Sequence, residues 1–363
     1  MPFNLKLEKT TTLTVALEPA RNVLASMLML AKDEELSGVT NWIQETRNKM
    51  SAEEKFLHKL VVIGFYHVIA VDESWNSFTD YLTHLSKMDP LAMRVKMLDA
   101  YANMNVKHQE GDQPLPAADW DVILASAESY VDFLIARFGE EYVDKEIETR
   151  AYEYVIDPPA MKSLIVDYLQ KAWEEWFRPE WERVQGLLVE SVQAFQNTDF
   201  ARMDRLEAAR FITGQDLAEE TWRPALEKAD RIVFIPCAHI GPYVSRLPDM
   251  NSLIVIFGAR TPDNAATRIP DLDRADIIAR LSALADETRL RILEMIRDNE
   301  EMRAQEIIEA TRLSQPSVSR YLGQLTATGY LQERRINGAK AYSLNRGRIT
   351  KTLKAVSVFL LGQ

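Results

Sequence analysis

The chain has 363 residues, of which 47% are hydrophobic and 27% charged, and its formal net charge is −11. This composition is typical of a globular protein large enough for two or three domains. No apolar run reaches the roughly 18–20 residues of a membrane-spanning helix, and the N-terminus lacks a signal-peptide pattern, so we expect no membrane partner. The single cysteine, Cys237, excludes an intrachain disulfide and fits a cytoplasmic protein.

The charge is unevenly distributed along the chain. Residues 312–363 contain nine lysines and arginines and one acidic residue, Glu333, so this segment carries +8 while residues 1–311 carry −19. Phosphate contacts supply most of the affinity of proteins for nucleic acid, and they require clustered lysine and arginine side chains. The C-terminal segment is therefore predicted to bind a polyanion.

The first 260 residues are predicted to form one α+β domain that is mostly helical. Apolar and polar residues alternate over residues 3–17, which favours a half-buried strand or hairpin. Apolar residues then recur at helical spacing from about residue 20 to residue 228. Two short β-branched runs, residues 231–236 and 252–258, predict buried strands that pair with the N-terminal strand.

The rest of the chain is predicted to be a linker and a second domain. Residues 261–273 contain two prolines and few apolar residues, which is typical of a linker. Residues 274–363 follow as a compact module. The predicted fold class is thus mainly α with small β elements, a large N-terminal domain being followed by a small C-terminal one.

Two features of the N-terminal domain could bind a ligand. Aromatic residues are frequent in its second half, where they either line a pocket for an apolar effector or pack as ordinary core, the second being favoured. They are Trp173, Trp176, Phe177, Trp181 and Trp222. Cys237 and His239 have the spacing of two metal ligands, but a buried thiol beside a loop histidine is the favoured interpretation. We predict no metal site, no cofactor and no catalytic constellation, hence no enzyme.

The C-terminal module has the pattern of two helices joined by a turn and followed by a hairpin. Asp286 can cap a helix, and a short helix is predicted near residues 304–310. Ser314 can cap a second helix, whose buried face repeats every three to four residues and which Gly329 ends. Asn337 and Gly338 then form the strongest two-residue hairpin turn signal.

Polar side chains of this second helix and the hairpin are the candidate DNA contacts. Short or bidentate polar groups near a helix N-terminus can read base edges in a major groove, and basic hairpin arms suit phosphate contact. The candidates on the helix are Gln315, Ser317, Ser319, Arg320 and Gln324. Those on the hairpin are Arg334, Arg335, Lys340 and Tyr342, and Thr288 and Arg289 are candidates for phosphate contact.

This module resembles the ArsR-type winged helix-turn-helix family. The resembling strings are LSALADETRLRIL at 281–293, LSQPSVSRYL at 313–322, LTATGYL at 325–331 and AYSL at 341–344. The resemblance covers about a quarter of the chain, and it implies a homodimer that binds an inverted repeat in double-stranded DNA. It also implies that the first and last helices of the module form the dimer contact. The apolar C-terminal residues Leu353, Val356, Val358, Phe359, Leu360 and Leu361 fit that role.

Two positions depart from the family pattern. Metal-sensing members carry cysteines in the helix before the turn, whereas residues 301–310 contain no cysteine or histidine, so metal sensing there is not expected. Gly323 stands inside the second helix, where the family usually has a long polar or basic residue. Either the helix is locally weak at this point, or close approach of DNA to the backbone favours glycine.

The sequence thus predicts a DNA-binding transcriptional regulator, a repressor or an activator. Its N-terminal domain is expected to sense a small molecule or to mediate assembly. The alternative is a protein–protein adaptor that uses the winged helix as an assembly module, because fold alone does not fix function. An N-terminal enzyme tethered to DNA is a third, weaker possibility.

Overall fold

The computed structural model describes residues 12–32, 40–103, 118–196, 198, 200–249, 252–260, 277–278, 280–336 and 339–361. Within these ranges the fold is mainly α with small β elements, as predicted. The chain separates into two compact units. Unit 1 comprises Met1–Leu17, Glu34–Ile43 and Val184–Gln363, and unit 2 comprises Glu18–Asp33 and Gln44–Arg183. The region predicted as one front domain therefore contributes to both units.

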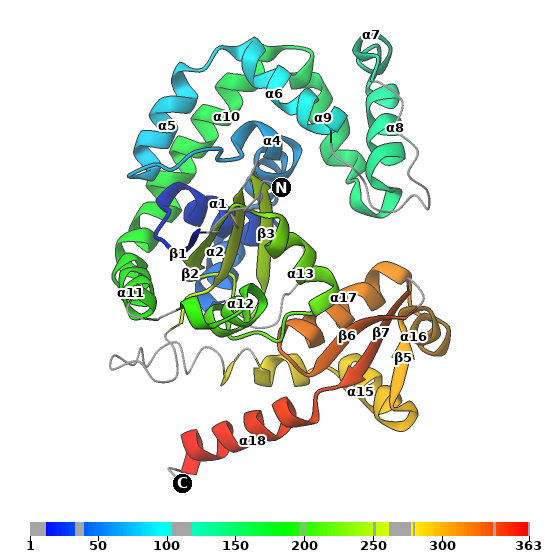
Figure 1. Ribbon diagram of the computed structural model, residues 1–363. Helices are drawn as coiled ribbons and strands as arrows, with labels where there is room; N and C mark the ends of the chain where they lie inside the picture. Colours follow the sequence, from blue (N-terminus) through cyan, green and yellow to red (C-terminus); the bar gives the residue numbers. More distant parts are fainter. Residues whose placement is uncertain are drawn as a thin grey trace, which may run out of the picture. The chain divides into compact units, whose positions relative to one another are not determined.

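Unit 2 is a helical unit, labelled by element in Figure 1. The prediction that this part of the chain is mostly helical is confirmed. The bounds are α1 Pro19–Ala31, α2 Asn41–Lys49, α3 Ala52–Lys59, η1 Leu60–Gly64, α4 Tyr66–Ile69, α5 Phe78–Lys87, α6 Pro90–Asn103, α7 Trp120–Ile123, α8 Ala127–Phe138, η2 Glu140–Tyr142, α9 Lys145–Val155, α10 Pro158–Ala172, η3 Trp173–Phe177 and α11 Arg178–Gln196. The start of α2, up to Ile43, and most of α11, from Val184 on, are assigned to unit 1.

Helix starts in unit 2 follow their capping residues. Ser51 and Glu54 form a capping box at the start of α3, in which Ser51 Oγ accepts from the Glu54 amide at 3.1 Å. Asp144 accepts from two amides of the first turn of α9. Between α3 and α4 the chain makes a π-helical turn, η1, which ends at Gly64. A Cβ on Gly64 would lie 3.3 Å from Ala151 Cβ, so α9 packs closely against this turn.

Unit 1 contains a four-stranded sheet of order β1-β2-β4-β3 (Figure 1). Strands β1 (Thr12–Val15), β2 (Arg231–Cys237) and β4 (Ser252–Gly258) are parallel, and β3 (Val244–Asp249) is antiparallel to β4. The predicted pairing of the two buried strands with an N-terminal strand is confirmed for residues 12–15. The earlier part of that predicted strand lies outside the described residues.

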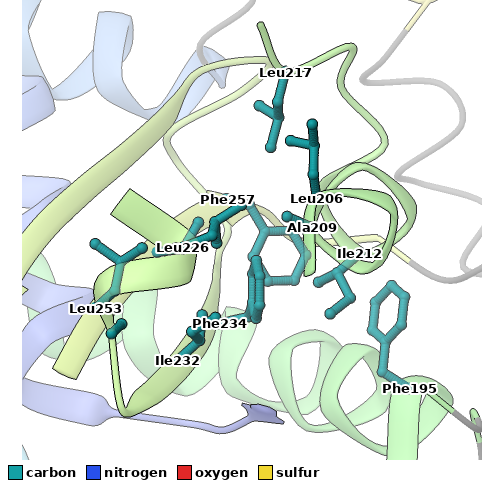
Figure 2. Packing of buried hydrophobic residues seen from close by; sticks show 12 residues of the cluster. Phe195, Leu206, Ala209, Ile212, Leu217, Leu226, Ile232, Phe234, Leu253 and Phe257 are labelled. Carbon is teal, nitrogen blue, oxygen red and sulfur yellow. The ribbon is translucent and has the colours of Figure 1, made fainter. Parts of the chain in front are cut away.

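One face of this sheet is covered by apolar side chains of nearby helices. Helices α12 (Arg205–Thr213) and α13 (Glu219–Lys228), with Phe195 of α11, pack against β2 and β4. Figure 2 shows the rings of Phe234 and Phe257 in the middle of this cluster, where their centroids lie 6.4 Å apart at nearly right angles. Burial of these large side chains holds the helices on the sheet.

The C-terminal part of unit 1 is a winged helix-turn-helix. A helical stretch at 280–284 precedes it, and its sheet has the order β5-β7-β6. The elements are α15 Glu287–Asn299, β5 Glu301–Arg303, α16 Ala304–Thr311, α17 Gln315–Ala327, β6 Leu331–Ile336, β7 Ala339–Leu344 and α18 Arg346–Leu361. The predicted helices and hairpin are confirmed, while β5 was not predicted. The predicted linker, 261–273, and the turn residues Asn337 and Gly338 lie outside the described residues.

Candidate nucleic-acid interface

The turn between α16 and α17 places the N-terminus of α17 on the surface. Arg312 ends α16 with a left-handed backbone, φ 58°, and its amide bonds to the Ile308 carbonyl at 2.9 Å. Ser314 then caps α17, because its Oγ accepts from the Ser317 amide at 3.4 Å. Pro316 lies in the first turn of α17, where amide groups have no intrahelical acceptor. The absence of an amide hydrogen on proline therefore costs no hydrogen bond there.

Helix α17 has one buried face and one polar face. Val318, Leu322 and Leu325 are buried in the core of the module. On the opposite side Gln315 and Ser319 are exposed, and Ser317 and Arg320 are partly exposed. The Arg320 guanidinium lies over the Tyr321 ring, with Cζ 4.7 Å from the ring centre. Four of the five helix candidates therefore reach solvent.

The fifth, Gln324, is buried together with Arg289. Arg289 donates to Gln324 Oε1 at 2.5 Å, and its other nitrogens donate to the carbonyls of Ala283 at 2.8 Å and Ser282 at 2.9 Å. Their exposed fractions are 2% for Gln324 and 7% for Arg289. The prediction that these two side chains face DNA is thus corrected: they join α15, α17 and the preceding helical stretch from inside.

The first turn of α15 holds the remaining helix candidate, Thr288, which is half-buried. Asp286 caps this helix by accepting from the Arg289 amide at 2.9 Å. The cap fixes the start of α15 and with it the position of Arg289.

The hairpin of β6 and β7 presents basic side chains that already have acidic neighbours. Arg334 makes a two-pronged contact with Glu301 of β5, at 2.5 and 2.6 Å, and both side chains are at least partly exposed. This hydrogen bond raises the pKa of Arg334 and lowers the pKa of Glu301. Lys340 is exposed and lies 3.1 Å from Glu333. Arg335 is exposed as well.

Tyr342 is the one hairpin candidate whose side chain is buried. It is 5% exposed, and its hydroxyl donates to Glu333 Oε2 at 3.2 Å. Burial raises the pKa of its hydroxyl, so the group stays protonated. The prediction of a direct phosphate contact by Tyr342 is corrected, because the ring is part of the module core while the exposed wing contacts are Arg334, Arg335 and Lys340.

The aromatic residues considered as an effector pocket divide between the two units. Trp173 and Phe177 are buried in unit 2, where Trp173 packs against Phe78 at 5.0 Å and Phe177 stacks on His58 at 6.5 Å. Burial lowers the pKa of His58 to about 4, so it is neutral. The half-buried Trp176 and Trp181 belong to unit 2, whereas Trp222 belongs to unit 1.

Cys237 and His239 are both buried in unit 1, and the His239 ring lies 4.8 Å from that of Trp42. Among the residues that the structure describes, no group of three or more His, Cys, Asp or Glu side chains is arranged to hold a metal ion. Within the same ranges, no helix is both long enough and apolar enough to cross a bilayer.

A buried polar cluster in unit 2 was not anticipated from the sequence. Glu148 of α9, Tyr130 of α8 and Tyr101 of α6 are 7%, 0% and 5% exposed. The signal was available, because Glu148 falls three and seven residues before the buried Ala151 and Val155, on the apolar face of its own helix.

Comparison with known proteins agrees with the geometry of the C-terminal module. An exposed polar helix held by a small core, with a basic hairpin beside it, defines a DNA-binding transcriptional regulator. Residues 286–333 match the family described as bacterial regulatory protein, arsR family, and the module belongs to that family.

A solved structure, that of NolR from Sinorhizobium fredii, is 31% identical to this chain over the aligned region. The alignment covers 26% of this chain and 94% of that one, with a TM-score of 0.20. A search of curated proteins found no match.

Proposed function

We propose that the chain is a homodimeric regulator that binds an inverted repeat in duplex DNA through α17 and the β6–β7 wing. The observation that carries the proposal is the polar face of α17, on which Gln315, Ser319 and Arg320 reach solvent while the opposite face is anchored in the core. A helix of this kind fits the major groove, where such side chains can contact base edges. Ser317, whose amide donates to the capping Ser314, contributes from the same turn as a contact residue.

The wing supplies the phosphate contacts in this proposal. Arg335 has an exposed side chain, and Arg334 and Lys340 can exchange Glu301 and Glu333 for phosphate oxygens. Exposed ion pairs of this kind are weak, so the exchange costs little. Each phosphate contact adds to the salt dependence of binding, because it releases counterions from the duplex.

Dimer formation would use the ends of the module. Leu353 and Leu360 of α18 are 58% and 70% exposed, and Ile278 and Leu281 before α15 are also exposed. Large exposed apolar side chains on a helix favour a partner surface. Val358, Phe359 and Leu361, which belong to the predicted contact, lie outside the side chains that the structure describes.

The remaining part of the proposal concerns the helical unit, unit 2. We assign it the sensing of a small molecule, and we assign the whole chain an action by binding and not by catalysis. Regulation then requires that the effector bind one conformation better than another, since a ligand shifts an equilibrium only through such a difference.

The test uses duplexes selected by the purified chain from a random pool, followed by fluorescence anisotropy on the selected sequence. Arg320→Ala is expected to weaken specific binding by about 1–3 kcal/mol and to relax preference at one base position. Arg150→Ala, which removes an exposed charge from unit 2, is the control and is expected to leave binding unchanged. Sedimentation of the complex should give two chains per duplex.

Salt separates DNA binding from the adaptor alternative. The logarithm of the association constant should fall linearly with the logarithm of salt concentration, because phosphate contacts release counterions. If the pool yields no preferred sequence, or if Arg320→Ala binds with unchanged preference, α17 is not the reading helix.

A further inference from the structure

The wing contacts an acidic segment of the same unit, residues 214–220, which joins α12 to the first turn of α13. The segment contains Asp216, Glu219 and Glu220, and all three side chains are exposed. It lies against strand β6, which carries two of the arginines that the proposed function assigns to phosphate. Acidic side chains therefore stand beside a surface whose positive charge is proposed to bind DNA.

Two hydrogen bonds join the acidic segment to β6. Glu220 Oε2 accepts from the backbone amide of Arg335 at 2.7 Å. Asp216 Oδ2 accepts from Gln332 Nε2 at 2.9 Å. Because Gln332 and Arg335 are three residues apart on one strand, the two carboxylates hold β6 at two points along its length.

A third hydrogen bond joins the acidic segment to α18. Arg348 Nη2 donates to the Gly214 carbonyl at 3.4 Å. The Arg348 side chain also packs on Gly329, where a Cβ would lie 2.9 Å from Arg348 Cγ, just before β6 begins. The contact thus involves the first, a middle and the last residue of the acidic segment.

The Arg335 amide needs an acceptor because β6 is an edge strand. The sheet order β5-β7-β6 leaves one side of β6 without a neighbouring strand among the described residues. Amides on that side of an edge strand have no partner in the sheet. Phosphate oxygens are suitable acceptors, and backbone amides are regular contacts of the DNA backbone. Glu220 therefore places a carboxylate where a phosphate oxygen would bind.

The charges of the contact agree with competition between the acidic segment and DNA. The pKa of Arg334 is raised chiefly by its hydrogen bond to Glu301, and the negative charge of Glu220 raises it further. A phosphate group that approached Arg334 or Arg335 would meet the Glu220 carboxylate at short range, where like charges repel. The acidic segment and the duplex backbone cannot both occupy this part of the wing.

The contact is of a kind that can open without unfolding. Asp216, Glu220 and Gln332 are all exposed. The apolar core of the four-stranded sheet and that of the module share no residue in the part of the chain that the structure describes. Polar, exposed contacts between separately packed parts are weak, and such parts commonly move relative to each other. Separation therefore leaves both cores intact.

We propose that the acidic segment is an internal competitor of DNA, which holds β6 through Asp216 and Glu220 and has to leave it before the duplex backbone binds there. The DNA affinity is then reduced in proportion to the fraction of molecules in which the contact is open. Any change that separates the segment from β6 raises the affinity without touching a DNA contact. This inference rests on the proposed function, since it assumes that the wing binds phosphate.

The first measurement detects the contact in the full chain without DNA. Hydrogen exchange at the Arg335 amide should be at least about tenfold faster in Glu220→Ala than in the wild type, because the amide loses its acceptor. Glu219→Ala is the matched control. Glu219 is exposed in the same helical turn and pairs with Arg223 at 2.8 Å, so its removal should leave the exchange unchanged.

The second measurement is DNA affinity, by anisotropy on the selected duplex. Glu220→Ala should bind at least about threefold more tightly than the wild type, whereas Glu219→Ala, with the same loss of charge, should gain less than about 1.5-fold. Gln332→Ala breaks the hydrogen bond to Asp216 without a change of charge, and it should bind about twofold more tightly. A general weakening of repulsion cannot explain that last gain.

A covalent link tests the opposite direction. The double variant Asp216→Cys/Gln332→Cys places a thiol on each side of the contact, and the native Cys237 is buried and thus protected from reagent. After reaction with a short bismaleimide, this variant should bind the duplex at least about tenfold more weakly than before reaction, because the contact can no longer open. The unreacted variant is the control.

The outcomes separate this inference from the proposed function. Unchanged Arg335 exchange in Glu220→Ala would show that the acidic segment does not hold β6 in solution. Normal DNA binding with equal affinities in the wild type, Glu220→Ala and Gln332→Ala would refute the competition alone, as would full affinity after linkage. If neither the wild type nor Glu220→Ala selects a duplex, the proposed function fails, and the competition fails with it.

Discussion

The winged-helix module and the helical unit both bury polar side chains, but they treat them differently. In the module, the buried Arg289 is matched by Gln324 and by the carbonyls of Ser282 and Ala283. In the helical unit, the buried Glu148 keeps an oxygen without a hydrogen-bond partner among the described residues. The difference teaches that burial alone does not mark a binding site. A paired polar group holds elements together, whereas an unpaired one indicates a ligand or water.

The comparison also separates two ways of presenting function. The module displays its contact residues on an exposed helix face, so its partner needs no opening of the protein. The helical unit keeps its polar atoms inside, so a ligand has to compete with the packing around them. Under the proposed function, a DNA-reading surface on the module and an effector site inside the helical unit would be the two distinct sites that coupling between DNA and an effector requires.

The largest effect is expected from breaking the paired cluster. Arg289→Ala removes three charged hydrogen bonds and leaves buried acceptors unpaired, so the free energy of unfolding of the module should fall by about 4 kcal/mol. Urea denaturation followed by near-UV circular dichroism measures this change. Arg291→Ala, an exposed residue on the same helix, is the matched control and should change it by less than about 0.5 kcal/mol.

DNA binding by Arg289→Ala should decline through loss of folded protein. The fraction that remains folded in stabilising osmolyte should bind with the same salt dependence as the wild type, because no phosphate contact has been removed. A reduced salt slope with unchanged stability would return Arg289 to the list of phosphate contacts.

The same contrast explains how far the sequence could be interpreted. The capping serine at 314, the apolar spacing of α17 and the Asn-Gly hairpin turn are local signals, so the helices and the hairpin of the module were predicted, while the short strand β5 was not. The burial of Arg289, Gln324 and Tyr342 was not predicted. Long polar side chains are buried only where the tertiary structure supplies hydrogen-bond partners, and the sequence pattern does not show those partners.

The front region shows the limit more clearly. Helical periodicity predicted that residues 20–228 are mostly helical, and β-branched runs predicted two strands and their pairing. The division of this region between two units depends on contacts between residues far apart in the chain. The Glu148 cluster combines side chains from α6, α8 and α9, so only its helical phase was visible in sequence.

The next effect concerns the unpaired cluster and its pH dependence. The Glu148 pKa is about 8 in the folded chain and close to 4.5 when unfolded, so the folded state binds this proton more tightly. Its stabilisation is complete below pH 4.5 and is lost as the pH rises through 8. Between pH 5 and pH 8 the wild type should lose about 3–4 kcal/mol relative to Glu148→Gln.

Denaturant titrations across this pH range give the comparison, with Glu146→Gln as the exposed control on α9. Parallel profiles for the wild type and Glu148→Gln would mean that the carboxyl ionises normally in the folded chain. The unpaired oxygen would then be hydrated, and the contrast between the two regions would disappear.

The smallest effect tests Gly323, for which the sequence left two explanations open. A Cβ at this position would meet nothing within 4 Å of its own chain, and the same is true of Gly186 in α11. Both glycines are exposed in helix interiors, so each alanine variant should stabilise the chain by about 0.5–1 kcal/mol. Neither glycine is needed for packing within the chain.

The two variants should differ only toward DNA. Gly323 lies one turn beyond Ser319 on the exposed face of α17, so a methyl group there would obstruct close approach of the duplex, whereas one at Gly186 would not. Anisotropy titrations should therefore show weaker operator binding for Gly323→Ala alone, by a few-fold, despite its higher Tm. Equal gains in stability with unchanged DNA affinity would show that the glycine weakens the helix without serving the interface, since nothing in the chain itself requires it.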